Sequence, residues 1–382
     1  MTTTKNNEHK KLNVPNLRFP EFQGEWEKCK LGDYGKVVTG NTPPTKDIEN
    51  YENGTYLWAS PADLGTIKSI TETKTMLSAQ GFSKTRTLPK GSVLVTCIGS
   101  TIGKTGMATK EMSTNQQINS IVVNDNNDNE FVYYAIQSAF PRYLSSIAVQ
   151  AVPIISKSAF ELLPNNRPYL QEQKKIGKFL SLLDERIATQ NKIIDKLQSL
   201  IKGIAQHCIR ELINGWEYVR LGDICKITTG KLDANAQVEN GQYPFFTCAE
   251  RPFNIDSYAF DTEALLISGN GANLGYINYY KGKFNAYQRT YVLDLFSVNI
   301  QYVKWALKVL LPQRIAIEKS SSNTPYIVLS TLADLKIPIP NNSKQNHIAN
   351  LMMSFERKLS TQLALSDLYN KQKQYLLRQM FI

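Results

Sequence analysis

The pattern of apolar and polar residues divides the chain into two kinds of segment. In residues 24–167, and again in 214–340, short runs rich in Val, Ile, Tyr and Thr alternate with clusters of Gly, Pro, Asn and Asp. This alternation is typical of strands joined by turns. Residues 130–140 and 300–311 differ, because their apolar residues recur at helical spacing. Each region is therefore predicted to be a mixed α/β domain.

The segments that follow these regions, 168–213 and 341–382, have apolar residues at heptad spacing and are predicted to be long helices. Gln190 interrupts the first series, and Gln362 stands at the same place in the second. Each helix could pack only on its own domain, but about four to five heptads favour an antiparallel coiled coil. The predicted contact positions are Ile176, Leu180, Leu183, Ile187, Gln190, Ile194, Leu197, Ile201 and Ile204 in the first helix, and Ile348, Met352, Phe355, Leu359, Gln362, Tyr369 and Leu376 in the second.

An antiparallel pair of helices would place the two domains at opposite ends of the pair. A helix of this length spans roughly 60 Å at 1.5 Å per residue, which is close to two turns of duplex DNA at about 3.4 Å per base pair. Ser366 and Lys373 make the second apolar series less regular than the first. The helices are nevertheless predicted to hold the domains at a fixed separation.

The two halves of the chain are copies of one another. GEWEKCKLGDYGKVVTG at 24–40 matches NGWEYVRLGDICKITTG at 214–230, so Trp26 pairs with Trp216 at an offset of 190 residues. A period this long excludes a solenoid built from repeats of 20 to 50 residues. It indicates instead a duplicated unit of one domain followed by one helix.

The match continues to the ends of the two halves. ENGTYLW matches ENGQYPF at an offset of 187, and QKKIGKFLSLLDERI at 173–187 matches QNHIANLMMSFERKL at 345–359 at an offset of 172. The offset falls from 190 to 172, so the second domain is 18 residues shorter. Because the copies are least alike between Gly65 and Pro89, the two domains are expected to have different binding specificities.

The charge of the chain indicates a polyanionic partner. Its 382 residues include 44 Lys and Arg against 33 Asp and Glu, a formal net charge of +11. Such an excess favours nucleic acid first and an acidic membrane surface second. The five cysteines lack the close pairing of zinc sites or secreted disulfide frameworks, so they are expected to be reduced in the cytoplasm. We find no signal-peptide core or membrane span, and residues 1–23 are predicted to be a polar arm.

The glycine loop GSTIGKT at 99–105 resembles a phosphate-binding P-loop without matching it. Only three residues separate Gly99 from Gly103, where a P-loop has four, and the second copy has Tyr276 in place of the lysine. We therefore predict a loop that lets the backbone approach a surface. Lys104 would then be available to contact a phosphate.

Other motifs of catalysis are also incomplete. The sequence from Asn41 to Pro44 resembles the catalytic loop of amino-group DNA methyltransferases, but Thr42 interrupts it and Thr45 replaces the aromatic residue that follows. No Gly-rich turn between strand and helix indicates a cofactor site. The three histidines form neither a triad nor a metal cluster in the sequence. We expect no catalytic residue, metal or cofactor in this chain.

The loops of both domains have the composition of a nucleic-acid-binding surface. Arg can bind guanine, and Asn or Gln adenine, in the major groove, whereas Lys mostly contacts phosphate. Each residue taken alone is also compatible with a solvated surface. Tyr56, Trp58, Tyr243 and Phe245 could stack on bases, but their strand spacing favours the core. The candidate DNA-contacting residues are Lys46, Lys84, Arg86, Lys104, Gln116, Gln117 and Asn119 in the first domain, and Lys231, Asn235, Arg251, Asn270, Asn273, Gln288, Arg289 and Asn323 in the second.

Several of these motifs together resemble a known family. They are the two W-x-x-x-x-L-G-D openings, the K-G-x-V-L strand, the segments YLWASPADLG, NQQINSIVV and AYQRTYVL, and the two helices in register. Over nearly the full chain they are similar to the specificity subunit of type I restriction-modification enzymes. No single motif would be sufficient for this comparison.

The resemblance implies a function and a set of partners. Each target recognition domain would bind one half of a bipartite DNA sequence, and the coiled coil would set the spacer. Two modification subunits would bind S-adenosylmethionine and methylate adenine, and restriction subunits would use ATP and Mg. The implied division is 1–23 N-terminal arm, 24–167 target recognition domain 1, 168–213 central helix, 214–340 target recognition domain 2 and 341–382 distal helix.

Two other hypotheses remain open from the sequence. A self-contained enzyme of nucleic-acid metabolism would need a cofactor motif that we do not find. A coiled-coil adaptor that binds only proteins would explain the helices, but it would leave the charge of +11 without a role.

Overall fold

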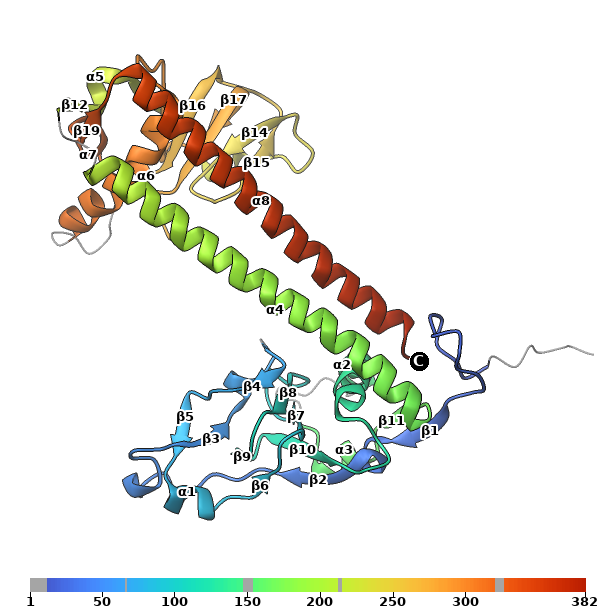
Figure 1. Cartoon of the computed structure of the whole chain (residues 1–382). Helices are drawn as coiled ribbons and strands as arrows, with labels where there is room; N and C mark the ends of the chain where they lie inside the picture. The colour runs from blue at the N-terminus through green and yellow to red at the C-terminus, as the bar shows by residue number, and fades with distance from the viewer. Residues whose placement is uncertain (1–11, 66, 147–153, 212–214, 320–325) are drawn as a thin grey trace, which may run out of the picture. The chain divides into compact units, whose positions relative to one another are not determined.

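The computed structural model describes residues 12–65, 67–146, 154–211, 215–319 and 326–382 (Figure 1). The chain forms two compact units. Unit 1 contains the residues up to Thr189 together with Ser366–Ile382, and unit 2 contains Gln190–Leu365. Two long helices, α4 (Leu170–Gln206) and α8 (Asn342–Gln379), each contribute to both units.

Unit 1 is built on two sheets and a packed helix. Its strands are β1 (Glu27–Lys30), β2 (Gly35–Thr39), β3 (Tyr56–Ala59), β4 (Ser69–Ile70), β5 (Thr75–Leu77), β6 (Thr87–Leu88), β7 (Val93–Thr96), β8 (Thr105–Ala108), β9 (Met112–Thr114), β10 (Ile118–Val123) and β11 (Pro164–Arg167), and its shorter helices are α1 (Ala79–Ser83), α2 (Asn129–Ser146) and α3 (Lys157–Glu161). The sheets have the orders β2-β10-β7-β8-β4 and β5-β3-β9-β6, and β1 pairs separately with β11. Helix α2 packs on β7 and β8.

Unit 2 repeats this plan with a single large sheet. Its strands are β12 (Glu217–Arg220), β13 (Lys226–Thr229), β14 (Tyr243–Phe246), β15 (Phe253–Ile255), β16 (Phe260–Ser268), β17 (Ile277–Ala286), β18 (Thr290–Asp294) and β19 (Lys336–Ile339), and its shorter helices are α5 (Leu221–Ile224), α6 (Ile300–Lys319) and α7 (Leu329–Ala333). The sheet order is β13-β18-β16-β17-β14-β15, and β12 pairs separately with β19. Helix α6 packs on β16 and β17.

The registers of the strands confirm the duplication predicted from the sequence. In unit 1, β3 pairs in parallel with β9 through Trp58 and Ser113; in unit 2, β14 pairs in parallel with β17 through Phe245 and Asn285. These partners are related by the sequence offsets of 187 and 172 residues. The counterpart of the ten-residue strand β17 is divided in unit 1 into β8 and β9. This division separates the strands of unit 1 into two sheets.

The central strands are buried on both faces. In β7, Val93 contacts the core that contains α2, whereas the next residue, Leu94, contacts a smaller core beside β3. In β16, Leu265 and Leu266 divide in the same way between the core of α6 and a smaller core beside β14. Because side chains alternate along a strand with a period of two, one strand serves both cores.

A buried glutamine near the start of each long helix fixes that helix to its own domain. Gln173 Oε1 accepts a hydrogen bond from the backbone N–H of Asp128 at 3.0 Å, and its Nε2 donates to the carbonyl of Pro168 at 2.9 Å. Its counterpart Gln345 makes the same two bonds, with the N–H of Asn299 and a proline carbonyl before α8, at 3.0 and 2.9 Å. The two glutamines are 1% and 2% exposed. Each amide is therefore satisfied inside its unit at both ends.

A carboxylate about three turns further along each helix forms a second attachment. Asp184 accepts a 2.6 Å hydrogen bond from the Tyr134 hydroxyl of α2, and its counterpart Glu356 pairs with Lys304 of α6 at 2.6 Å. Burial, followed by the charge of Asp184, raises the pKa of Tyr134, so this hydroxyl stays a donor at neutral pH. The two units thus share the position of the carboxylate but differ in the group that binds it.

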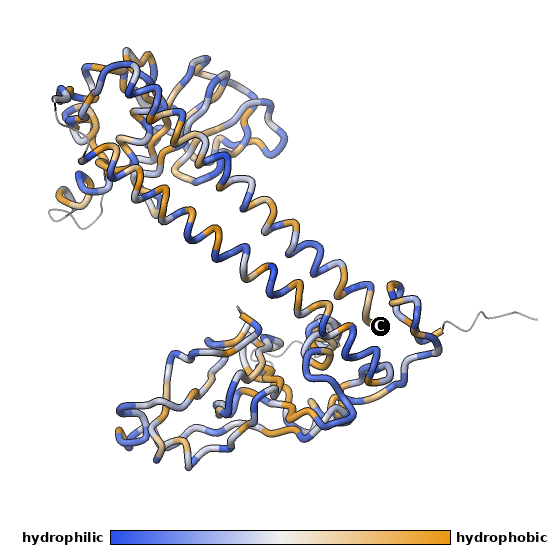
Figure 2. Tube along the Cα trace, viewed as in Figure 1, coloured by the Kyte–Doolittle hydropathy of each residue, from blue (hydrophilic) through white to orange (hydrophobic). Residues whose placement is uncertain are grey.

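The long helices pair in antiparallel orientation. In unit 1, Asp184 pairs with Lys373 at 2.7 Å, and Arg186 Nε donates to the Tyr369 hydroxyl at 3.1 Å. The partner numbers therefore fall along α8 as they rise along α4. Figure 2 shows apolar residues recurring along both helices between polar ones. Among the heptad positions, Ile176, Leu180, Gln190, Ile194, Leu197, Ile201, Ile348, Met352 and Leu376 are buried, and Leu183, Ile187, Ile204, Phe355, Leu359, Gln362 and Tyr369 are half-buried.

A polar contact interrupts the apolar stripe within unit 2. Gln190 is 4% exposed, and its Nε2 donates to Gln362 Oε1 at 2.8 Å and to the Gln362 carbonyl at 3.0 Å. Gln362 is also the repeat counterpart of Gln190, 172 residues later. Equivalent antiparallel helices bring a residue opposite its own counterpart only at a twofold axis. The contact therefore marks the local pseudo-twofold axis of the coiled coil.

The central helix departs from the regular helix predicted for residues 168–213. Regular α-helix ends at Gln206, and His207–Glu211 form a π-helical turn; residues 212–214 lie outside the described part of the chain. Cys208, which the heptad pattern places on the stripe, is 6% exposed within this turn, and Ile209 is 1% exposed. A π turn rotates the side chains that follow it, so helical periodicity does not predict its position.

The glutamine contact yields a prediction about stability. Replacing Gln362 alone by Leu removes one acceptor from the buried Gln190 amide and should lower the free energy of unfolding by about 1 kcal/mol. Replacing both glutamines by Leu should raise it above the wild-type value, because two apolar side chains then meet. Denaturant unfolding of the purified subunit measures both, with the exposed neighbour substitution Leu363→Ala as a control. A single variant as stable as the double variant would contradict the assigned contact.

Candidate nucleic-acid interface

Both units contain the same four-residue turn after the strand that pairs with β3 or β14. In unit 1 the turn covers residues 115–118; Cys97 N–H donates to the Gln117 carbonyl at 2.8 Å, and Gly40 N–H donates to the Ile118 carbonyl at 3.1 Å. In unit 2 the turn covers residues 287–290; the Gly269 N–H donates to the Arg289 carbonyl at 2.8 Å, and the Gly230 N–H donates to the Thr290 carbonyl at 3.2 Å. In both units the turn is therefore held by backbone hydrogen bonds from neighbouring elements.

A glycine in each unit permits this arrangement. A Cβ atom on Gly40 would lie 2.2 Å from the Thr114 carbonyl oxygen, and one on Gly230 would lie 1.9 Å from the Ala286 carbonyl oxygen. Real Cβ atoms do not approach backbone this closely, so both positions require glycine. The T-G pair at the end of each W-x-x-x-x-L-G-D opening thus brings the next loop against the turn.

The P-loop-like glycines have two different roles. Gly103 and its counterpart Gly275 have φ of +91° and +81°, and a Cβ atom on them would lie 2.5 Å from Phe140 and 2.6 Å from Ile315. They pack the loop on the domain helix. Gly99 and its counterpart Gly271 have φ of +94° and +78°, and a Cβ atom on either would have no backbone atom within 4 Å. This part of the loop is therefore open beside the turn.

Unit 1 gathers three of the predicted DNA-contacting residues around Asn41. The Asn41 side chain donates to the Lys84 carbonyl at 2.9 Å and accepts from the Arg86 N–H at 2.8 Å. Gln116 Oε1 accepts from the Thr42 hydroxyl at 2.5 Å. The exposed residues Lys84, Arg86 and Gln116 therefore lie on one loop cluster. Asn41 holds this cluster together. It is also the first residue of the incomplete methyltransferase-like motif, but its role in this structure is to bond the backbone of the neighbouring loop.

The other predicted residues of unit 1 are placed differently. Asn119 is 3% exposed, and its Oδ1 accepts from the Thr39 hydroxyl at 2.6 Å, so it is a core residue in this structure. The side chain of Lys104 is exposed, and its methylene groups lie against Gly65. Lys46 is exposed, and Gln117 is half-buried, with its Oε1 accepting from Asn115 Nδ2 at 3.0 Å.

Unit 2 gathers its predicted residues around a cysteine. Cys248 Sγ donates to Asn270 Oδ1 at 3.0 Å and lies 3.5 Å from the Arg289 carbonyl, while Asn273 Nδ2 donates to the Cys248 carbonyl at 3.0 Å. Sequence reasoning missed Cys248, because nothing in its spacing distinguishes it from the other cysteines. Gln288 lies beside Arg289 on the same turn.

The remaining predicted residues of unit 2 lie outside this cluster. Lys231, Asn235 and Arg251 are exposed, and none of the contacts above includes them. Asn323 lies outside the described residues.

The four aromatic residues expected in the core divide into three classes. Trp58 and Phe245 are 9% and 0% exposed, as predicted. Tyr243 is half-buried. For Tyr56 the prediction was wrong, because its ring is 38% exposed and stacks on Phe82 with a centroid separation of 4.5 Å. A period of two predicts which face of a strand a residue lies on, but not what covers that face.

No metal centre is evident in the part of the chain that the structure describes, and two of its buried thiols are protonated. No group of three His, Cys, Asp or Glu side chains in that part is placed to hold a metal ion. Burial raises the pKa of Cys97 and of Cys225 to about 12, so both thiols are protonated at neutral pH.

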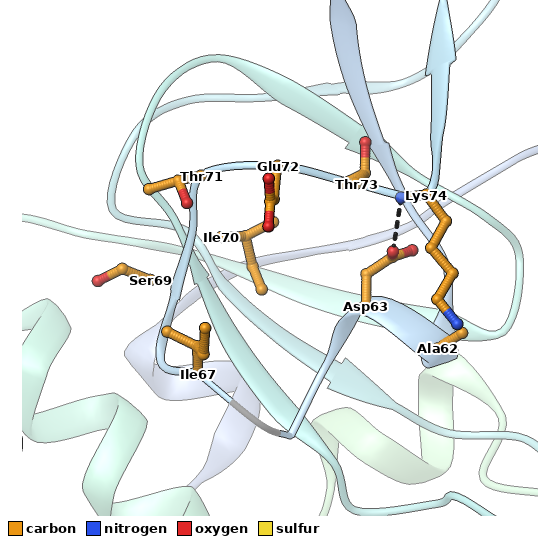
Figure 3. Close-up of a pocket in the computed structure, with 9 residues that line it drawn as sticks. All are labelled: Ala62, Asp63, Ile67, Ser69, Ile70, Thr71, Glu72, Thr73 and Lys74. Atoms are coloured by element: carbon orange, nitrogen blue, oxygen red, sulfur yellow. Dashed lines mark hydrogen bonds between the residues drawn. The ribbon is translucent and has the colours of Figure 1, made fainter. Parts of the chain in front are cut away.

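A pocket of about 280 Å³ in unit 1 lies at the start of the region where the two copies are least alike (Figure 3). Its lining includes the carboxylates of Asp63 and Glu72, and Asp63 accepts a hydrogen bond from the Lys74 N–H at 2.8 Å. Two carboxylates are unsuited to a phosphate backbone. This pocket therefore lies apart from the candidate interface in chemistry as well as in sequence.

The frame shared by the two units agrees with a known family. The family model for the type I restriction modification DNA specificity domain matches residues 23–199 and 213–365. The chain belongs to this family. As a specificity subunit of a type I restriction-modification system, it confers recognition of a DNA sequence, which favours DNA binding over the adaptor hypothesis.

Individual relatives support the same assignment. The specificity subunit of the MjaIX enzyme of Methanocaldococcus jannaschii is 26% identical over 361 residues, which cover 83% of each chain. The specificity subunit of the Escherichia coli EcoDI enzyme is 45% identical over 134 residues, which cover 35% of this chain and 30% of that subunit. The stronger local identity is thus confined to about a third of the chain.

Solved structures share the fold of this specificity subunit. The crystal structure of the S subunit of a type I restriction-modification system from M. genitalium matches with a TM-score of 0.68 and 19% identity, covering 97% of this chain and 99% of that one. A chain from a structure of type I complex assembly and conformational transition matches with a TM-score of 0.57 and 18% identity, covering 92% and 96%. Among the described residues, no helix has both the length and the apolar character needed to cross a membrane.

The loop of Lys46 tests the placement of the interface. Replacing this exposed lysine by Gln should reduce the slope of log affinity against log salt by about 0.9 if one phosphate contact is lost, without changing the preferred sequence. DNA binding of the assembled complex at several salt concentrations measures the slope. Lys28→Gln, an exposed lysine of β1, is the matched control. If Lys46→Gln and Lys28→Gln gave the same slope of log affinity against log salt, the DNA would not contact the loop of Lys46.

Proposed function

We propose that the two units of this specificity subunit recognise the two halves of one bipartite DNA site and that the coiled coil sets the spacer between them. Each half-site would be bound by one target recognition domain through the turn and loop cluster described above. The observation that carries the proposal is the duplication itself: one backbone frame occurs twice in the chain, with different loops on it.

The chemistry of the frame supports this assignment. Backbone hydrogen bonds and glycine contacts hold the turn in both units, so the exposed side chains can vary without loss of the fold. A site that must be preorganised but changeable in sequence is expected to be built in this way. The positive charge of the chain supplies attraction to phosphate that does not depend on sequence.

Partners would carry out the reactions. We propose two modification subunits, which bind S-adenosylmethionine and methylate adenine, and restriction subunits, which use ATP and Mg and join for cleavage. The specificity subunit itself would be non-catalytic and would act in the cytoplasm, where its substrate DNA lies. The local pseudo-twofold axis at Gln190 and Gln362 suits the binding of two copies of one partner.

The proposed functional division follows the sequence copies. Residues 24–167 and 214–340 would be the two target recognition domains, and 168–213 and 341–382 the two spacer helices. Residues 1–23 would form an N-terminal arm; in its described part, Arg18 binds the buried carboxylate of Glu172 with two bonds of 2.8 and 2.7 Å. The arm would thereby fix the start of the central helix.

Single-molecule sequencing of N6-methyladenine tests the proposed function. DNA from cells that express this subunit with its modification partner should carry a split motif of two short half-sites around a fixed gap. Cells without the subunit should lack that motif. The absence of any motif while the same partner is active with another specificity subunit would contradict the proposal.

The role of the helices generates a separate prediction. Deleting residues 187–193 and 359–365, the heptads centred on Gln190 and Gln362, shortens both helices by about 10 Å while leaving Asp184 and Glu356 in place. The methylated motif should keep both half-sites and lose about three base pairs of spacer, at about 3.4 Å per base pair. Replacing residues 24–167 by the first domain of another family member is the matched test, and it should change one half-site without changing the gap. A changed half-site in the deletion variant would contradict this division of roles.

A further inference from the structure

The turns at 115–118 and 287–290 differ at one position that matters for base recognition, which is half-buried in unit 1 and exposed in unit 2. Their central residues are Gln116 and Gln117 in unit 1, and Gln288 and Arg289 in unit 2. Gln117 and Arg289 occupy equivalent positions. The Gln117 carbonyl accepts a hydrogen bond from the Cys97 N–H, and the Arg289 carbonyl accepts one from the Gly269 N–H, both at 2.8 Å. Each donor follows the strand that leads into the open glycine loop of its unit. The two units therefore present a glutamine and an arginine from the same point of the same frame.

The side chain of Arg289 is available for a ligand. It is exposed, and the structure gives its guanidinium no hydrogen bond or ion pair with another described residue. Only its backbone carbonyl is used, by Gly269 N–H and by Cys248. An arginine whose backbone is fixed and whose guanidinium is unoccupied presents all its donors to a ligand from a defined point of the frame.

Gln117 occupies the same position of the frame, but its amide is half-buried and held by a neighbouring side chain. Its Oε1 accepts from Asn115 Nδ2 at 3.0 Å, which orients the amide, and its Nε2 would lie 3.9 Å from a Cβ atom on Gly99. Asn115 also fixes the turn, because its Oδ1 accepts from the Gln117 N–H at 3.0 Å. The amide is thus positioned by the turn rather than free in solvent.

The space beside both turns is open. Gly99 and Gly271 have left-handed φ values, and a built Cβ on Gly271 has no atom within 4 Å. Side-chain-free backbone at this point lets a bulky ligand approach the turn closely. On the adjoining loop of unit 1, Lys84 Nζ donates to Asn50 Oδ1 at 2.9 Å and Arg86 Nη1 donates to the Thr39 carbonyl at 2.7 Å. Both positive charges are thereby held in the loop cluster, where they favour a phosphate.

We propose that these equivalent positions read corresponding base pairs of the two half-sites, with Arg289 selecting guanine in one half-site and Gln117 selecting adenine in the other. Arginine matches the O6 and N7 acceptors of guanine, and glutamine matches the N6 donor and N7 acceptor of adenine in the major groove. The inference rests on the proposed function, since it names the residues that distinguish the two half-sites.

The test exchanges the two side chains, one unit at a time. Arg289→Gln should change the methylated motif at one base pair of one half-site, where the preference for guanine falls about ten-fold or more and adenine is accepted. Gln117→Arg should change one base pair of the other half-site toward guanine. Arg220→Gln, an exposed arginine of β12 in the same unit as Arg289, removes the same charge and should leave the motif unchanged.

Several outcomes would overturn the inference. They are an unchanged motif in both exchange variants, a change of both variants in the same half-site, or the same change in Arg220→Gln. If Arg289→Gln abolishes methylation, the Gln117→Arg variant decides, because it adds a positive charge instead of removing one. Loss of methylation in both variants, with the complex still assembled, would assign these residues to general affinity. A wild-type complex without any split motif would contradict the proposed function itself, whereas a wild-type motif that both exchanges leave intact contradicts only this inference.

Discussion

The attachment of each long helix to its own domain is the constraint on which the rest of the structure depends. Gln173 and Gln345 are almost fully buried, and each amide is satisfied at both ends by groups inside the same unit. A buried amide without these partners would be costly, so the helix leaves the domain in one direction. The proposed spacer role requires a helix start that is fixed on its own domain, and these two hydrogen bonds supply that attachment within each unit.

The two copies share backbone contacts and differ in the side chains that these contacts position. The backbone bonds of the turn, the close glycine contacts and the position of the helix carboxylate recur in both units. The partner of that carboxylate differs, with the hydroxyl of Tyr134 in one unit and the ammonium of Lys304 in the other. The side chains on the turn also differ. A frame held largely by backbone contacts tolerates such changes at its exposed side chains, although Asn41 and Asn115 also contribute bonds to it in unit 1.

The coiled coil combines stability with a defined register. Apolar heptad layers would also pair after a shift of seven residues, because such a shift keeps stripe against stripe. The contact between Gln190 and Gln362 would not survive the shift, since each amide would then meet an apolar or aromatic position of the stripe. The ion pair of Asp184 with Lys373 adds a second condition in unit 1. Polar contacts at two places therefore select one register from several that are nearly equal in apolar burial.

The sequence by itself determined the duplication, the mixed α/β domains, the two long helices and the family, because periodicity and internal repeats are properties of the chain that do not require coordinates. It also named Gln190 and Gln362 as the interruption of the heptads. Only the tertiary structure decided that Asn119 is buried, that Tyr56 is exposed, that α4 ends in a π turn and that Cys248 joins the cluster of Asn270 and Arg289. The physical reason is that burial and hydrogen bonding depend on which strands, distant in the sequence, lie beside one another. A local pattern of residues does not contain that information.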